Sequence, residues 1–176
     1  MRLPPTAPAA LLLTVLTGTV LLILWLGGPF YRPICAPGQH GVVTQFIAND
    51  GHLYTASGKL NPGGSGFEAT GRGGALLFGP YASLPPGRYR VTWYGEVQSP
   101  SAPRFDIVSA PGARTLAQAE VALPGPSGSA GGHPAALHSL TFATTTPVEG
   151  VETRVLVREN DRLVVSKVRL EAESCN

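Results

Sequence analysis

The chain has 176 residues and a formal net charge of +2, with 43% hydrophobic and 14% charged residues. This length allows one ordinary domain. Arg2 precedes a long apolar run, so twelve of the thirteen basic residues and all eleven acidic ones follow that run. The near balance argues against a nucleic-acid-binding protein, because such a protein needs a basic stripe that releases counterions from phosphates.

The first element predicted along the chain is a transmembrane helix over residues 9–28, after a short cytoplasmic N-terminus at 1–8. No charged side chain occurs between Leu3 and Tyr31, and about 20 apolar residues in a helix span the hydrocarbon core of a bilayer. Trp25, Phe30 and Tyr31 gather at the far end of this run. Amphipathic rings favour the headgroup level, so these three residues are predicted to mark the membrane interface.

A cleaved signal peptide is the alternative interpretation, with Arg2 as its basic N-terminal region. The apolar run is longer than that of a usual signal peptide, and "GGPFYRPICAPG" offers no clear small-x-small cleavage site. The sequence therefore favours an uncleaved anchor that contacts the lipid bilayer through residues 9–28. Residues 29–41, rich in proline and glycine, follow as a linker.

Two cysteines bear on the cellular compartment in which the domain lies. Cys35 follows the apolar run and Cys175 is the penultimate residue. The two ends of a β-sandwich often lie close together, so a disulfide between them is plausible, and two free thiols are the alternative. A disulfide indicates an oxidising compartment. We therefore expect a single-pass protein of the bacterial inner membrane, with its N-terminus in the cytoplasm and residues 42–176 in the periplasm.

Short apolar runs separated by turn residues fill the rest of the chain, and no helical period is visible. This pattern predicts an all-β fold, an antiparallel β-sandwich. The predicted strands are Val42–Ile47, Gly66–Thr70, Ala75–Phe78, Tyr89–Gln98, Arg104–Ser109, Ala117–Leu123, His138–Thr144, Val151–Arg158 and Leu163–Glu171.

Alternation along these strands predicts which side chains face the core. The inward set is Tyr89, Val91, Trp93, Val97, Phe105, Ile107, Val151, Val155, Val157, Val164, Val168 and Leu170. The outward set is Arg90, Thr92, Tyr94, Glu96, Asp106, Glu152, Arg154, Arg158, Lys167 and Arg169. Pro85 and Pro86 end the segment before Gly87, because proline cannot donate to a β-ladder.

The sequence offers no catalytic signature. The four histidines have no metal-binding spacing, no CxxC pair is present, and the glycine-rich "GRGG" precedes no helix that would hold a phosphate. Outward carboxylates can form a pair for glycoside hydrolysis, but cross-strand pairing with arginine and lysine is their ordinary use. We predict a protein that is not an enzyme and has no cofactor, metal or catalytic residues.

The run "FGPYASLPPGRYRVTWYGEV", followed by "VETRVLV" and "LVVSKVRLE", resembles the jelly-roll, carbohydrate-binding-like modules of bacterial envelope proteins. The likeness covers roughly residues 66–171. It implies a jelly-roll sandwich that binds its ligand on a concave face or on end loops, and it carries over no catalytic residues.

Two hypotheses follow. In the first, the membrane-anchored module binds envelope polysaccharide or supports a glycan-handling system, through residues on the outward strand faces: Arg90, Tyr94, Asp106, Glu152 and Arg154. In the second, the chain is an accessory or structural subunit whose helix and periplasmic domain pack on partner subunits of a larger inner-membrane complex. Neither hypothesis involves nucleic acid.

Overall fold

The computed structural model describes residues 34–109, 113–126 and 133–175. The chain divides into two compact units, Met1–Arg32 and Pro33–Asn176, and all described residues belong to the second. The predicted transmembrane segment and its interface residues Trp25, Phe30 and Tyr31 lie outside the described residues. Within the described ranges, no helix is long and apolar enough to cross a membrane.

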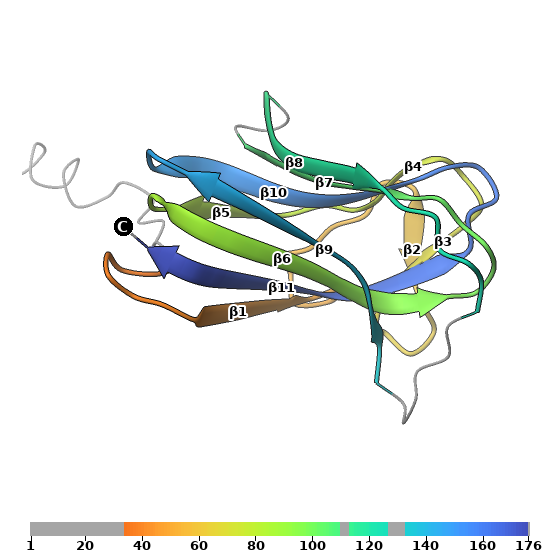
Figure 1. Cartoon of the computed structure of the whole chain (residues 1–176). Coiled ribbons are helices and arrows are strands. Elements are labelled where there is room, and N and C mark those ends of the chain that lie inside the picture. Colours follow the sequence, from red (N-terminus) through yellow and green to blue (C-terminus); the bar gives the residue numbers. More distant parts are fainter. Residues whose placement is uncertain (1–33, 110–112, 127–132, 176) are drawn as a thin grey trace, which may run out of the picture. The chain divides into compact units, whose positions relative to one another are not determined.

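The described unit is an antiparallel β-sandwich of eleven strands in two sheets (Figure 1). In the six-stranded sheet the order is β2-β3-β11-β6-β9, and β1 also pairs with β11. Its strands are β1 (Val42–Ile47), β2 (Gly58–Leu60), β3 (Phe67–Ala69), β6 (Gly87–Val97), β9 (Ala135–Thr144) and β11 (Leu163–Cys175).

The five-stranded sheet has the order β4-β10-β7-β8, and β5 also pairs with β10. Its strands are β4 (Gly74–Leu77), β5 (Pro80–Leu84), β7 (Arg104–Ser109), β8 (Arg114–Glu120) and β10 (Val148–Val157). All registers between strands in both sheets are antiparallel. The predicted all-β sandwich is therefore confirmed for this unit.

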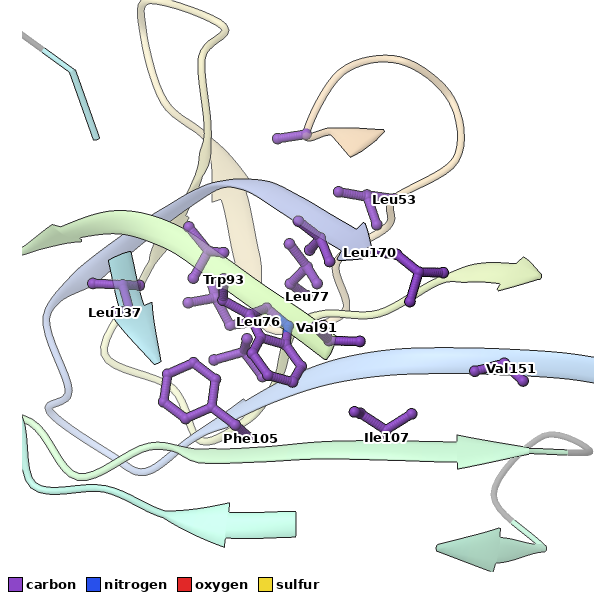
Figure 2. Close-up of a cluster of buried hydrophobic side chains, with 14 of the residues drawn as sticks. Leu53, Leu76, Leu77, Val91, Trp93, Phe105, Ile107, Leu137, Val151 and Leu170 are labelled. Atoms are coloured by element: carbon purple, nitrogen blue, oxygen red, sulfur yellow. The ribbon is translucent and has the colours of Figure 1, made fainter. Parts of the chain in front are cut away.

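The core lies between the two sheets, and aromatic rings join them (Figure 2). Trp93 on β6 and Phe105 on β7 are fully buried, with their ring centroids 5.2 Å apart. Burying aromatic side chains of this size supplies much of the apolar area that stabilises a domain. Tyr89, Val91 and Ile107, predicted to face inward, are also fully buried, whereas Asp106 on β7, predicted to face outward, is buried as well.

One inward prediction on β11 is wrong. The register of β11 against β6 shifts between Val165 and Lys167, which is the mark of a β-bulge. One extra residue reverses the alternation, so Leu163 and Val165 belong to the core cluster while Val164 turns to the outer face. The predictions for Val168 and Leu170, beyond the bulge, are confirmed.

The disulfide between Cys35 and Cys175 is present, with their Cα atoms 6.5 Å apart. Both residues are buried beside Tyr89, whose hydroxyl lies 3.9 Å and 3.8 Å from the two sulfurs and donates a hydrogen bond to the Pro85 carbonyl at 2.6 Å. Burial raises the pKa of Tyr89 to about 12. The bond ties the start of the described chain to the end of β11.

Candidate functional site

A cavity of about 270 Å³ opens on the outer face of the six-stranded sheet, near the bulge in β11. We call it the β11 pocket. Typical ligand pockets measure about 300–1,000 Å³, so this one suits a small group such as one unit of a polymer. Its lining residues are Ile47, Asn61, Ser65, Gly95, Glu96, Pro134, Val164, Ser166 and Lys167.

Part of the pocket lies where β11 changes its neighbour. β1 pairs with β11 from Lys167 to Ala172, whereas β3 pairs with it at Val164 and Val165. Ser166 lies between the two stretches, and its carbonyl accepts the last hydrogen bond from the β1 side, from the Ala48 amide at 3.0 Å. A strand that loses one neighbour before gaining the next leaves a gap on that side. Ile47 and Ser166 line the pocket at this gap, and Gly95 and Glu96 of β6 line it on the other side of β11.

One wall of the pocket is a turn that Asn61 holds in shape. The Asn61 side-chain oxygen accepts hydrogen bonds from the Ser65 amide at 2.8 Å and the Gly66 amide at 3.2 Å, and its side-chain nitrogen donates to the Ser65 hydroxyl at 3.1 Å. Asparagine often closes a turn in this way. The amide and the hydroxyl are therefore fixed in place before any ligand arrives.

Another part of the pocket lining is Lys167, a cation that lies over an aromatic ring. The Lys167 ammonium lies 4.5 Å from the ring centroid of Tyr94, a cation–π contact between neighbouring strands. The Ser166 hydroxyl donates to the Tyr94 carbonyl at 3.2 Å. Glu96 lines the same pocket, so its charged lining residues are one cation and one anion, and the site favours neither sign of ligand charge.

The structure divides the five predicted ligand-binding residues between two sheets. Arg90 and Tyr94 lie on β6, on the face that carries the β11 pocket, whereas Asp106 lies on β7 and Glu152 and Arg154 lie on β10. Arg90 is engaged by Glu173 at 2.6 Å. No single site can therefore contain all five, and their role in ligand binding stays a prediction.

On the five-stranded sheet, Arg154 and Asp106 face each other across the β7–β10 ladder. The guanidinium donates to both carboxylate oxygens, at 2.7 Å and 2.9 Å, and this hydrogen bonding raises the pKa of Arg154. Arg104 adds a contact at 3.4 Å, and the Asp106 side chain is only 2% exposed. A ligand would reach this carboxylate only by displacing its arginine partners.

Glu152 lies beside Tyr81 on the neighbouring strand β5. Glu152 is buried, and Tyr81 has a backbone φ of 62°, which is rare for a residue other than glycine. Burial, followed by the charge and the hydrogen bond of Glu152, raises the pKa of Tyr81. Tyr54 packs on Tyr81 and on Phe78, with ring centroids 6.3 Å and 5.7 Å apart. Glu152 is thus a buried carboxylate beside the phenol of Tyr81.

None of the five predicted ligand-binding residues lines the pocket, and sequence reasoning proposed none of its lining residues as a ligand-binding residue. Asn61, Ser65 and Pro134 lie in turns or just before a strand, and their approach to β11 depends on the pairing of distant strands. The "NPGGS" turn was a visible signal for ordered turn chemistry, but it did not reveal what the turn faces. Among the described residues, no group of three histidine, cysteine, aspartate or glutamate side chains is arranged to hold a metal ion.

Comparisons with known proteins give little guidance. No family model matches the chain, and no curated protein matches it. Among solved structures, it is similar to the C-terminal CBM6 of LamC, a marine laminarinase from Zobellia galactanivorans, with a TM-score of 0.44 and 13% identity over 73% of this chain and 98% of that one.

A carbohydrate-binding module from Cellvibrio mixtus lichenase 5A, in complex with cellotriose, has a TM-score of 0.40 and 12% identity over 80% of this chain and 98% of that one. The VP2 subviral particle of infectious bursal disease virus has a TM-score of 0.41 and 12% identity over 79% of this chain and 34% of that one. Scores this low occur both for carbohydrate-binding modules and for a subviral particle, so they decide neither the family nor the ligand of this chain.

Proposed function

We propose that this protein is a non-catalytic, jelly-roll, carbohydrate-binding-like module that binds envelope glycan in the β11 pocket. The observation that carries the proposal is the pocket itself, whose lining combines the polar side chains of the Asn61 turn with charged and apolar residues. The resemblance of residues 66–171 to carbohydrate-binding-like modules of envelope proteins supports the same ligand class.

The chemistry of the lining suits a ligand rich in hydroxyl groups. A sugar hydroxyl both donates and accepts hydrogen bonds, and the Asn61 amide, the Ser65 hydroxyl, the Glu96 carboxylate and the Lys167 ammonium offer both kinds of partner. The side chain of Ile47, which is 49% exposed, offers an apolar surface for the C–H face of a ring. The small volume fits one sugar unit at a time, while the open sheet face lets a polymer continue past it.

The pocket supports binding rather than hydrolysis. Glycoside hydrolysis in most enzymes uses two carboxyl groups on either side of the scissile bond. Among the lining residues of the β11 pocket, Glu96 is the single carboxylate. We therefore assign Glu96 to ligand recognition and propose no catalytic step.

We further propose that residues 9–28 anchor the module in the bacterial inner membrane and that the sandwich faces the periplasm. The disulfide between Cys35 and Cys175 supports this placement, because disulfides persist in oxidising compartments. In this arrangement the partners are the lipid bilayer and the envelope polysaccharide near the membrane.

The test is glycan binding by the full chain purified in detergent, first on a glycan array and then by calorimetric titration with the best ligand. Lys167→Ala and Asn61→Ala are expected to weaken binding about tenfold or more, because the first removes a hydrogen-bond donor to the ligand and the second releases the turn that holds Ser65 in place. Arg88→Ala is the matched control, since Arg88 is an exposed cation on the same strand as Tyr94, at the end of β6 away from the pocket.

Equal losses for Arg88→Ala and Lys167→Ala would show that net charge, not the pocket, governs binding. No binding across the array would refute the glycan proposal. In that case, co-purification of the chain in a stoichiometric membrane complex would favour the accessory-subunit hypothesis.

A further inference from the structure

Strand β1 is an edge of the six-stranded sheet, and its sequence lacks the features that usually protect an edge. Its residues, VVTQFI, include no charged residue and no proline, whereas native edge strands commonly carry these to prevent pairing with other chains. Val43 and Ile47 expose 40% and 49% of their surface. In Figure 1, β1 lies at the outer margin of its sheet.

The other margins of this sheet differ from β1. β2 carries the charged Lys59, and β9 runs against β8 of the second sheet. β1 pairs with β11 on one side and has no neighbouring strand among the described residues on the other. It is therefore the margin most open to a further strand.

The hydrogen bonds define which main-chain groups are open. The Ala48 amide bonds to the Ser166 carbonyl, so in this register residues 42, 44 and 46 direct their main-chain groups toward β11. Residues 43, 45 and 47 direct theirs away from it. At Ile47 these groups are already used, because the Asp50 carboxylate accepts from the Ile47 amide at 2.7 Å and the Asp50 amide donates to the Ile47 carbonyl at 3.1 Å.

The main-chain amides and carbonyls that remain open are thus those of Val43 and Gln45, which flank Thr44 on either side. We propose that β1 pairs antiparallel with β1 of a second copy of this chain, with Val43 opposite Gln45 of the second copy and Gln45 opposite Val43 of the second copy. This register uses both amides and both carbonyls of each strand, which gives four hydrogen bonds across the two-fold axis.

The side chains agree with this register. On the inner side of the sheet, Thr44 meets its own copy on the axis, and Val42 meets Phe46 of the second copy. Val42 and Phe46 are partly buried against the core of their own domain, so the pairing extends the apolar layer from one copy into the next. Because β1 has no charged side chain, an antiparallel copy brings no like charges together.

The dimer has a consequence that rests on the proposed function. A two-fold axis perpendicular to the joined sheets keeps their outer faces on one side, and the β11 pocket lies at the Ile47 end of β1 on that face. Two pockets would then face the same polymer. Such bivalent binding raises the apparent affinity without any new contact to the ligand.

The test uses the full chain in detergent and cysteine substitutions on β1, with the native disulfide intact. Directly opposed residues in a non-hydrogen-bonded pair approach closely enough for a disulfide. Under mild oxidation Thr44→Cys is expected to form a covalent dimer on a non-reducing gel. Val43→Cys is the matched control, because in this register Val43 faces Gln45 of the second copy and not another Val43.

A substitution that removes the open amide provides the second measurement. Proline is tolerated on an edge strand where the amide faces solvent, so Gln45→Pro is expected to keep the thermal unfolding transition of the parent protein. It removes two of the four intermolecular hydrogen bonds and should weaken dimerisation about tenfold or more in sedimentation equilibrium. Binding of a single glycan unit should survive in this variant, which separates the dimer from the proposed function.

Several outcomes would overturn the proposal. A parent protein that sediments as a monomer at all accessible concentrations would do so. Cross-linking of Val43→Cys or Gln45→Cys as readily as Thr44→Cys would exclude this register. A dimer that persists unchanged in Gln45→Pro would place the interface elsewhere.

Discussion

Arg154 and Asp106 form a cross-strand ion pair whose geometry stabilises the fold. The two residues are opposed on neighbouring strands, their hydrogen bonds are bidentate, and the Asp106 carboxylate is almost completely covered. Alternation predicted correctly that both lie off the core face. It could not predict that they would engage each other, because pairing depends on the register between β7 and β10.

Removing the arginine from this pair should destabilise the protein. Arg154→Met leaves a covered carboxylate with a weaker partner, and breaking such a pair costs several kcal/mol when both groups are buried. Because Arg154 is about one quarter exposed, we expect a loss of about 2–3 kcal/mol in the free energy of unfolding, measured by urea denaturation.

Arg104→Met is the control for the Arg154 substitution. Arg104 contacts the same carboxylate at 3.4 Å, but its side chain is about half exposed, so its loss should cost less than about 1 kcal/mol. Equal losses of stability in the two variants would mean that the bidentate geometry adds no stability. That result would favour the predicted role of Arg154 in ligand binding.

At the scale of elements, nine of the eleven strands were predicted, the short β3 and β4 among them, and β2 and β5 were missed. Val42–Ile47 and Arg104–Ser109 match β1 and β7 in full, and the predicted Tyr89–Gln98 and Leu163–Glu171 fall largely within β6 and β11. β2 was missed because its three residues, GKL, contain one apolar side chain and show no alternation. β5 was missed because it begins at Pro80, and proline is a poor signal for a strand.

The face assigned to Val164 shows the limit of alternation. A strict period of two holds until a bulge adds a residue, and the bulge near Ser166 follows from the pairing of β11 with three different strands. The β11 pocket arises at the same place. Both features depend on contacts between distant strands, so a pattern read along one strand cannot reveal them.

A glycine next to this bulge tests how tightly the two strands must approach. A Cβ atom added to Gly95 would collide with the Val164 carbonyl oxygen of β11 and would also press on Leu137. Because a backbone atom cannot move aside easily, Gly95→Ala should lower the free energy of unfolding by about 2–4 kcal/mol. Chemical denaturation followed by tryptophan fluorescence would measure this, since Trp93 lies two residues away in the core.

Gly63→Ala provides the comparison for Gly95→Ala. A Cβ atom at Gly63 has its nearest neighbour at an ordinary distance of 3.8 Å, the Ser65 hydroxyl, so stability should change by less than about 0.5 kcal/mol. A tolerated Gly95→Ala would mean that β6 and β11 lie further apart near the pocket than the structure shows.

At the scale of the whole molecule, the disulfide links residues that are far apart in the sequence. It joins residues 140 positions apart, and hydrogen bonds accompany it: the Gly38 amide donates to the Cys175 carbonyl at 2.6 Å, and the Cys175 amide donates to the Gln39 carbonyl at 3.0 Å. The segment before β1 is thus attached to the end of β11 by both covalent and hydrogen bonds. The predicted bond followed from chain ends meeting in a sandwich, a property of the whole fold that needs no knowledge of register.

Loss of the bond should destabilise the domain globally. In the chain-entropy model, opening a loop of this length costs about 4–5 kcal/mol, because the unfolded chain regains conformational freedom. We expect Cys35→Ser with Cys175→Ser to show this loss in urea denaturation, and the oxidised protein with added reductant to approach the same midpoint. Hydrogen exchange at the Gly38 and Cys175 amides should rise further than at amides of the β6–β11 ladder, since the attached segment can then open by itself. A double variant within about 1 kcal/mol of the parent would mean that packing around Tyr89 and the main-chain hydrogen bonds hold the two ends together without the covalent link.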